Sequence, residues 1–411
     1  MLFYQGETRV LQQSAVIIGA GVVGVASAYA LAERGWQITL VDQGAGPATG
    51  ASHSNGAQLS YCFTDALGSP STFAALPSLL AGKGGVSIGL SARPGYLCWL
   101  ARFARNCTAG RFRANTLAVL DLATRSRAAM DRLCEMHSLE FSHRVAGKVN
   151  LLYSPHDERR AAEIVAFKRD AGCEQELIDR SQLEQLDPAL EGLDEAVIGA
   201  VSTPSEVVGD PLLFSRSLVD VLTSEYGMAT RFDTGVRAIE ERADTATITL
   251  GNGEQLNADM VVVAGGHSSN ALLGPTGNAI GLQPIKGYSF EMPLANGSPQ
   301  ISVTDGKRRL VFTNLGDRMR VAGIAEVGNG SLDIDSARID WLIASASESL
   351  PNAGDFSKAG KFWTGLRPST PNSQPVIRRA SKRIAINTGH GSLGWTLAMG
   401  SAEQLASLVE S

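Results

Sequence analysis

The chain contains no charged residue from Leu11 to Ala32. Within this stretch the arrangement of apolar residues changes from one typical of a β-strand to one typical of an α-helix. Val16–Ile18 form a short β-branched run, which is typical of a buried parallel strand. Residues 26–34 then read as a helix, and a second strand over residues 38–41 follows it. The stretch is long enough to cross a bilayer. Three glycines interrupt it and no basic cluster flanks it, so a strand, a turn and a helix explain it better.

The turn between the first strand and this helix carries a G-x-G-x-x-G motif over residues 19–24. Gly19 allows a tight turn, Gly21 lets the backbone approach a pyrophosphate, and Gly24 lets helix and strand pack closely. Val22 and Val23 fill the two positions between Gly21 and Gly24, ahead of the predicted helix, whose free N–H groups attract phosphate.

The second strand ends in Asp42, followed by Gln43, at the position where a carboxylate accepts from a ribose hydroxyl. An acid there favours an unphosphorylated ribose. The unit therefore predicts a dinucleotide site and does not distinguish FAD from NAD.

Two later segments repeat the pattern of an apolar strand that runs into glycines. Residues 259–266 end in Gly265 and Gly266, after a predicted strand from Val236 and a hairpin over residues 247–256. Residues 384–395 form a further strand and turn, followed by a helix to the C-terminus. We expect these separated blocks to build one nucleotide-binding fold.

The segments between these blocks are predicted to contain both strands and helices. Strand-like runs are predicted over residues 148–153, 196–201, 282–292, 309–314 and 319–323. Helices are predicted over residues 114–137, 157–171 and 334–350. This mixture predicts a second, α+β part of the molecule.

The length, net charge and cysteine spacing of the chain exclude several classes of protein. A chain of 411 residues is longer than a domain with a single hydrophobic core usually is, so two domains are expected. The net charge of −5 argues against a nucleic-acid partner. The five cysteines show no C-x-x-C motif and no spacing suited to metal ligands. We therefore expect neither a disulfide framework nor a metal site, and we expect the protein to reside in a reducing compartment.

Several segments together resemble the D-amino-acid oxidase/sarcosine oxidase superfamily of FAD enzymes, and within it the bacterial D-amino acid dehydrogenases. They are residues 16–42, 50–60 (GASHSNGAQLS), 209–211 (GDP), 286–289 (KGYS), 362–368 (FWTGLRP) and 387–400, which begins NTGHGSLGWT. The resemblance implies an α/β fold with a discontinuous Rossmann-like FAD-binding domain over residues 1–85, 208–278 and 356–411. A substrate-binding α+β domain with an antiparallel sheet would comprise residues 86–207 and 279–355.

The resemblance also implies which residues hold FAD. To those of the first motif it adds Ser52, Ser54, Asn55, Gln58, Val236, Gly265, Gly266, Gly389, His390, Gly391, Leu393, Gly394 and Trp395. Some sarcosine oxidases attach FAD to a cysteine after the G-L-R-P segment. Residues 369–373 contain none here, so FAD is expected to be bound non-covalently.

Three residues are candidates for substrate chemistry. In the resembled superfamily the arginine of G-L-R-P, here Arg367, binds the substrate carboxylate, and a guanidinium fork suits that task. Tyr288 could hydrogen-bond the same carboxylate, and Lys286 would lie near the flavin. A domain-joining salt bridge, a packed strand tyrosine and a solvated lysine are the ordinary alternatives. The roles of His53 and His390 stay open at this stage.

The expected reaction is oxidation of a D-amino acid by hydride transfer from Cα to flavin N5, followed by hydrolysis of the imine to a 2-oxo acid and ammonia. The alternatives are a D-hydroxyproline or other cyclic secondary-amine dehydrogenase, an oxidase that releases peroxide, and a non-catalytic flavoprotein. The resemblance implies a respiratory-chain electron acceptor and a location on the cytoplasmic side, with peripheral contact to the inner membrane. Residues 86–103 fit either a membrane surface or the cap of a core.

Overall fold

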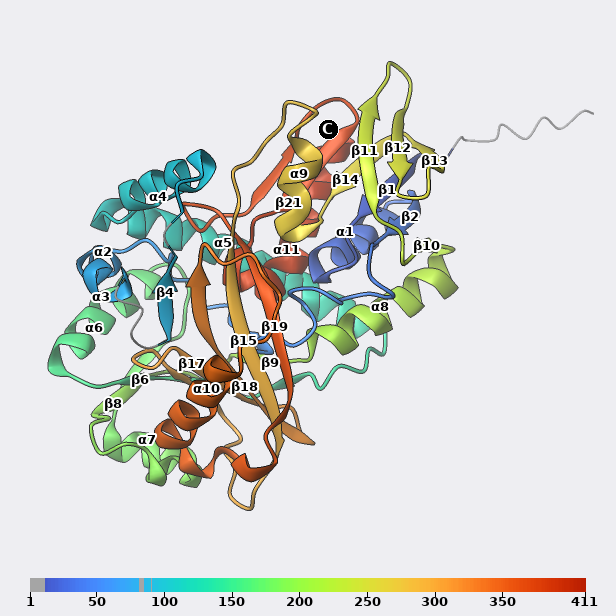
Figure 1. The fold of residues 1–411 in the computed structure, drawn as a ribbon. Helices are drawn as coiled ribbons and strands as arrows, with labels where there is room; N and C mark the ends of the chain where they lie inside the picture. Colours follow the sequence, from blue (N-terminus) through green and yellow to red (C-terminus); the bar gives the residue numbers. More distant parts are fainter. Residues whose placement is uncertain (1–11, 81–84, 90) are drawn as a thin grey trace, which may run out of the picture.

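The computed structural model describes residues 12–80, 85–89 and 91–411, which build two large sheets (Figure 1). The first sheet has six strands in the order β10-β2-β1-β14-β21-β20. All neighbours are parallel except β20 and β21. The strands are β1 (Ser14–Ile18), β2 (Gln37–Val41), β10 (Ala229–Arg231), β14 (Met260–Val263), β20 (Val376–Arg379) and β21 (Ile384–Thr388). As predicted, separated blocks of the chain form one nucleotide-type sheet.

Successive side chains of these strands point to opposite faces of the sheet, and both faces are buried. Ile17 and Leu40 pack under helices, while Ile18 and Val41 pack under a three-stranded antiparallel sheet. The helices are α1 (Val22–Ala32), α5 (Ala109–Met136), α8 (Pro211–Tyr226) and α11 (Gly394–Glu410). The small sheet comprises β11 (Val236–Glu241), β12 (Ala246–Leu250) and β13 (Gln255–Ala258).

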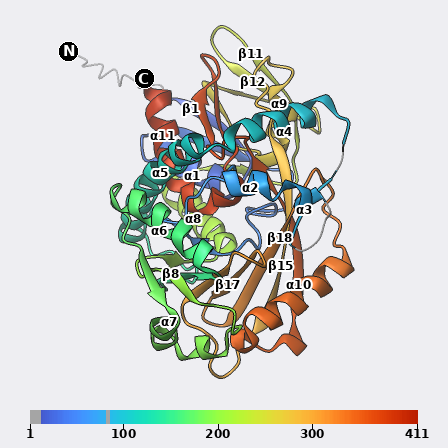
Figure 2. The same ribbon diagram turned by 90° about the vertical axis from the view of Figure 1, so that its left-hand side faces the viewer.

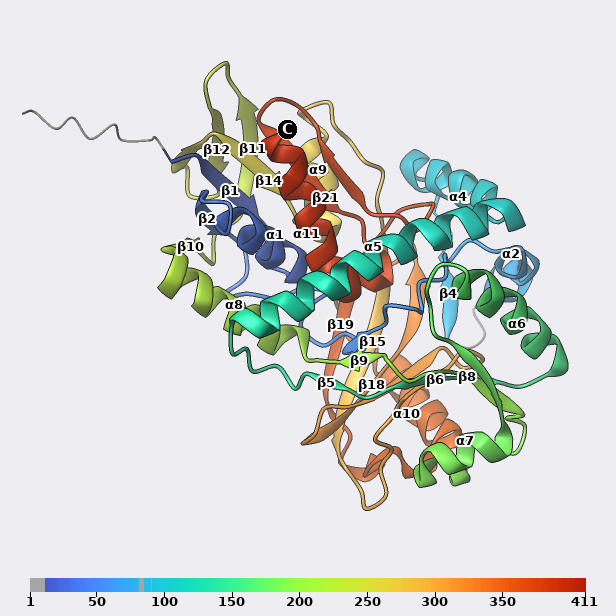
Figure 3. The ribbon, with the colours of Figure 1, turned by 180° about the vertical axis from the view of Figure 1, so that it is seen from behind.

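Helix α5 crosses the back of the molecule beside α11 (Figure 3). Gly400 of α11 permits the close approach, because an added Cβ would lie 2.6 Å from the Leu122 carbonyl oxygen. The predicted domain division assigned this helix to the substrate-binding part. The structure instead packs it into the core of the nucleotide-type part.

The second sheet has nine strands and is mostly antiparallel, with the order β19-β15-β18-β17-β16-β6-β8-β7 and β4 beside β18. Only the pairs β16–β6 and β18–β4 are parallel. The strands are β4 (Val86–Ile88), β6 (Lys148–Leu152), β7 (Glu176–Asp179), β8 (Gly199–Thr203), β15 (Gln283–Pro293), β16 (Ser302–Asp305), β17 (Leu310–Asn314), β18 (Arg318–Val327) and β19 (Gly360–Ser369). The predicted boundary at residue 356 is too early, because β19 pairs with β15 in this sheet.

One face of the large sheet packs against α10 (Ser336–Ser349), which lies with α7 (Arg180–Leu186) at the lower end of the molecule (Figure 2). The opposite face is turned toward the six-stranded sheet. The remaining elements are α2 (Pro70–Ala74), α3 (Leu76–Leu80), α4 (Pro94–Asn106), α6 (Pro155–Arg169), α9 (Ser269–Leu273), β3 (Gln58–Leu59), β5 (Arg144–Val145) and β9 (Val207–Val208).

No helix in the described ranges is both long and apolar enough to cross a membrane. The uncharged stretch noted in the sequence is divided between β1, the glycine turn and α1 from residue 14 onward.

The cysteines depart from the sequence-based expectation. Cys62 and Cys173 form a disulfide, with their Cα atoms 5.8 Å apart and a sequence separation of 111. Such a separation gives no motif that sequence reading could detect. The bond joins the loop after β3 to the segment after α6, and it packs against Leu120 of α5.

Replacing both Cys62 and Cys173 by serine is expected to lower the free energy of unfolding by about 2–4 kcal/mol, because the cross-link restricts a long loop in the unfolded chain. Urea unfolding under non-reducing conditions measures this loss. Cys98→Ser is the control, since Cys98 is free and exposed. Equal stability of the double variant and the wild-type protein would contradict the prediction.

Candidate active site

A cavity lies between the two sheets, and the turns at the ends of β1, β2, β14 and β21 form most of its wall, with β19 on the other side. This is the edge of a parallel sheet where its strands end in glycine-rich turns. Most of the predicted cofactor residues line the cavity: Gly19, Gly21, Val22, Val23, Asp42, Gln43, Ser52, Asn55, Val236, Gly265, Gly266, His390, Gly391, Gly394 and Trp395.

Two positions of the first glycine turn, Gly19 and Gly24, have no room for a side chain. Gly19 has a φ of 107°, and an added Cβ there would lie 2.6 Å from the Ala264 carbonyl oxygen. An added Cβ on Gly24 would overlap the Gly19 carbonyl oxygen. Gly21 faces the Ser52 hydroxyl, which accepts a hydrogen bond from the Val22 amide at 3.2 Å. The backbone is therefore bare where a pyrophosphate would approach the start of α1.

Asp42 lies at the end of β2 and is fixed by two backbone amides. Its oxygens accept from Ala20 N at 2.6 Å and from Gly44 N at 2.7 Å. A carboxylate oxygen can accept more than one hydrogen bond. Asp42 can therefore hold the glycine turn and still receive a ribose hydroxyl.

His390 also lines the cavity, after β21 and shortly before the start of α11. It is buried, and its Nε2 atom has no hydrogen-bond partner among the described residues. Burial lowers its pKa to about 3, so the ring is neutral at physiological pH. An orphaned buried ring nitrogen beside the N-terminus of α11 is suited to the polar edge of a flavin. Together with the bare glycine turn, it shows that these residues fit FAD.

Five predicted cofactor residues lie outside the cavity wall. Gly24 packs under the turn, Leu393 joins the helical core, and Gly389 adopts a φ of 84° at the end of β21. The Ser54 carbonyl accepts from the Ser289 hydroxyl at 2.6 Å, and the Gln58 amide donates to the Phe312 carbonyl at 3.4 Å. These five support the walls around the site.

Arg367 is a half-buried cation in the cavity wall without an acidic partner among the described residues. Its guanidinium lies over Gly287 and donates to the Ile324 carbonyl at 3.0 Å. Burial lowers its pKa to about 10, so the side chain still carries its charge at neutral pH. A charged fork in this position is available to a carboxylate ligand.

The structure does not bring the side chains of Tyr288 and Lys286 to Arg367. β15 pairs with β19 without interruption from Gln283 to Ser289, so Lys286 and Tyr288 alternate with Gly287, the residue under Arg367. The Tyr288 hydroxyl donates to Glu326 at 3.4 Å, and the Lys286 ammonium donates to the Asp333 carbonyl at 2.5 Å. Tyr288 contributes to the cavity wall, but its hydroxyl is directed toward the α10 side of the sheet.

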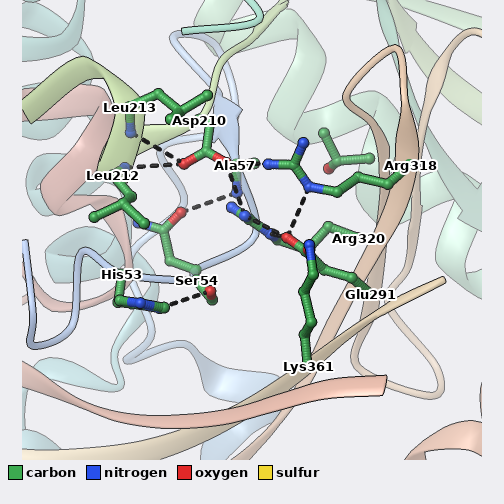
Figure 4. Close-up of polar contacts among 12 residues, drawn as sticks. His53, Ser54, Ala57, Asp210, Leu212, Leu213, Glu291, Arg318, Arg320 and Lys361 are labelled. Atoms are coloured by element: carbon green, nitrogen blue, oxygen red, sulfur yellow. Dashed lines mark hydrogen bonds and ion pairs between the residues drawn. The ribbon is translucent and has the colours of Figure 1, made fainter. Parts of the chain in front are cut away.

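A buried ionic network joins the large sheet to α8 beside His53 (Figure 4). Arg320 pairs with Glu291 at 2.6 Å and with Asp210, the residue that caps α8, at 2.8 Å. Arg318 also binds both acids, and Lys361 lies 3.1 Å from Glu291. Burial would raise the pKa of Glu291, but the charge of Arg320 and the hydrogen bonds from its cationic partners outweigh this and hold the pKa at about 2.

Glu291→Gln is expected to lower the free energy of unfolding by about 2–4 kcal/mol at pH 7, because it removes the anion that Arg320 faces. The folded-state pKa of Glu291 is depressed, so its contribution is present above pH 4.5 and is lost as pH falls toward 2. Urea unfolding at pH 7 and pH 3.5 should show a smaller difference from wild-type at the lower pH. Glu254→Gln, at an exposed turn, is the control. A difference that does not change with pH would contradict the assignment.

Sequence reading missed part of the cavity wall. Thr49, Gly50 and Ala51 directly precede the predicted Ser52, and Asn387 and Thr388 precede the predicted His390. Their position in the same turns is the signal that would have included them. Trp363 also lines the cavity, and its spacing of two and four residues from Gly365 and Arg367 places all three on one face of β19.

Comparison with known proteins gives one consistent result. Residues 14–408 match the family described as DAO, FAD dependent oxidoreductase. The chain is 36% identical over 405 residues to "D-amino acid dehydrogenase 2" of Ralstonia nicotianae and 34% identical over 399 residues to "D-amino acid dehydrogenase" of Rhizobium johnstonii. Each alignment covers 96% of this chain and 95% of the relative.

Solved structures share the fold at low sequence identity. Glycine oxidase from Geobacillus kaustophilus superposes with a TM-score of 0.77 at 19% identity, covering 97% of this chain and 94% of that one. L-proline dehydrogenase from P. horikoshii gives 0.73 at 19% identity, with 97% and 93% covered. L-α-glycerophosphate oxidase from Mycoplasma pneumoniae, determined with FAD bound, gives 0.71 at 16% identity, with 97% and 95% covered.

Proposed function

Because the chain belongs to the DAO family of FAD dependent oxidoreductases, we propose that it is a D-amino acid dehydrogenase. It would oxidise the Cα–N bond of its substrate to an imine, which water hydrolyses to a 2-oxo acid and ammonia. The names of two relatives that match over nearly their full length support this choice. The observation that carries it is Arg367, a cation in the cavity wall that has no acidic partner in the part of the chain that the structure describes.

Arg367 would bind the substrate carboxylate through two parallel hydrogen bonds and thereby fix the position of Cα. FAD, when bound, supplies the acceptor for the hydride that leaves Cα. Asp42 is the only carboxylate among the described residues of the cavity wall, and it lies at the end of β2, where the ribose of FAD would bind. The substrate amine therefore has no acidic partner there and would react in its neutral form, which removes the need for a strong side-chain base.

A panel of amino acids with an artificial electron acceptor tests the proposal. D-amino acids should be turned over and their L-enantiomers should not, and D-proline in the panel reports a preference for cyclic secondary amines. Parallel assays with oxygen alone should release little peroxide if a carrier is the acceptor. Absence of turnover with every D-amino acid would overturn the proposal.

We further propose that the electrons leave toward an acceptor at an anionic membrane surface and that α2 and α4 contact this surface. Between Ala66 and Leu120 the sequence has six Lys and Arg and no Asp or Glu, although the whole chain is acidic. Phe73 of α2 and Leu97 of α4 are 55% and 52% exposed, and Arg102 and Arg105 are exposed on α4. Apolar side chains flanked by arginines suit the interface of a membrane rich in anionic lipid.

Vesicle flotation tests this contact. Wild-type protein should float with phosphatidylglycerol vesicles at low salt and less so at high salt. A variant with Arg102→Glu and Arg105→Glu should stay at the bottom, while Arg237→Glu, on the exposed strand β11, should behave as wild-type. Equal flotation of all three proteins would contradict the assignment of this surface.

A further inference from the structure

We infer that Trp363 forms the wall against which the substrate side chain packs, and that this subsite takes uncharged side chains, aromatic ones above all. The inference rests on the proposed function, because it concerns the substrate that Arg367 holds. It adds the part of the pocket that would select among D-amino acids.

Trp363 and Arg367 lie on the same face of the large sheet. Both belong to β19, four residues apart, and Gly365 lies between them. The regular pairing of β19 with β15 sets Gly365 opposite Gly287 and Trp363 opposite Ser289. Side chains at these positions therefore share one face of the sheet, and Trp363 and Arg367 on that face both line the cavity.

Gly287 and Gly365, which are paired across the two strands, leave a space on the sheet that the side chains of Arg367 and Trp363 fill. An added Cβ on Gly287 would overlap the guanidinium of Arg367. An added Cβ on Gly365 would overlap the six-membered ring of the Trp363 indole. Cβ positions of a directly opposed pair are about 5 Å apart, so the indole and the guanidinium must lie side by side over the two glycines.

This arrangement determines where the substrate side chain would lie. A carboxylate held by Arg367 places Cα one bond beyond the carboxyl carbon, close to the hollow. Any substituent of Cα on the side of Gly365 then contacts the indole ring. Trp363 is thus the first surface that the side chain meets, and an aromatic side chain gains most from an aromatic wall.

The surroundings of the indole favour uncharged side chains. Ala322, Leu366 and Pro368 also belong to the cavity wall, and among its described residues only Arg367 and Asp42, the latter at the end of β2, carry a charge. His53 lies behind the indole with its ring centroid 6.5 Å away and a tilt of 15° between the rings. Burial, followed by the charge of Arg320, lowers the pKa of His53, so this neighbour is neutral at pH 7. A charged side chain would lose its hydration here without gaining a partner.

The test compares D-phenylalanine with D-alanine in three FAD-loaded proteins: wild-type, Trp363→Ala and Phe362→Ala. Phe362 is the matched control, because it is the neighbouring aromatic residue on the other face of β19 and is 42% exposed. In Trp363→Ala, the ratio of kcat/KM for D-phenylalanine to kcat/KM for D-alanine should fall about 10- to 50-fold. In Phe362→Ala, the ratio should stay within about threefold of wild-type.

A binding measurement separates this inference from the proposed function. Calorimetry with 3-phenylpropionate and propionate, which have the same carbon skeletons without the amine, needs no turnover. The affinity ratio of the two acids should fall in Trp363→Ala by the same factor as the kinetic ratio. A wild-type protein that binds both acids but oxidises no D-amino acid would refute the proposed function alone. An unchanged or increased ratio in Trp363→Ala would overturn the role of Trp363.

Discussion

Replacement of Arg367 by alanine is expected to lower kcat/KM for D-amino acids about a thousandfold, because the substrate carboxylate then enters the cavity without its cationic partner. FAD content should be unchanged, since the guanidinium lies over Gly287 on the large sheet and not in the glycine turns. The free energy of unfolding should be equal to or higher than that of wild-type, because a charge that lacks an acidic partner has been removed from a partly buried position. Steady-state kinetics with an artificial acceptor and urea unfolding measure the two effects.

Two further variants isolate the guanidinium. Arg367→Lys should recover only part of the activity, since an ammonium cannot make the two parallel hydrogen bonds. Arg237→Ala is the control, because Arg237 also donates to a backbone carbonyl but lies exposed on β11. Retention of wild-type kcat/KM in Arg367→Ala would exclude Arg367 as the carboxylate-binding residue. A loss of stability with normal activity would instead show that it joins the two parts of the molecule.

Gly24→Ala is expected to abolish FAD binding and to lower the free energy of unfolding by more than about 3 kcal/mol. The added Cβ would overlap the Gly19 carbonyl oxygen, which is backbone and cannot move without opening the turn. Flavin absorbance of the purified protein and urea unfolding measure the outcome.

Gly46→Ala is the matched control for the glycine turn. No atom lies within 4 Å of an added Cβ at Gly46, and its φ is not in the left-handed region. This variant should bind FAD and match wild-type stability within about 0.5 kcal/mol. A Gly24→Ala protein that is yellow and stable would show that the turn has another conformation.

The cofactor site could be predicted largely from local sequence. Its glycine-rich turns directly follow strands that are recognisable in the sequence. Fifteen of the twenty predicted cofactor residues line the cavity. The identification was possible because Gly19, Gly21 and Gly24 act within one short segment. Other wall residues, such as Thr49 and Asn387, lie next to the predicted residues but carry no pattern of their own.

The substrate side of the cavity could be predicted only in part. The motif singled out Arg367, which lies in the cavity wall, but the direction of the Tyr288 hydroxyl depends on the register between β15 and β19. A shift of one residue exchanges the two faces of a strand, and no local signal sets this register. The Cys62–Cys173 disulfide and the packing of α5 on α11 likewise depend on contacts between distant segments.

We expect the cavity to hold FAD and to present a D-amino acid to it through Arg367. Anaerobic titration of the purified yellow protein tests this most directly, with the flavin absorbance followed during addition of D-phenylalanine or L-phenylalanine. We predict that the D-enantiomer bleaches the wild-type flavin rapidly, that the L-enantiomer does not, and that Arg367→Ala bleaches about a thousandfold more slowly at low substrate concentration. A wild-type flavin that stays oxidised with every D-amino acid, or that bleaches equally with both enantiomers, would contradict the claim.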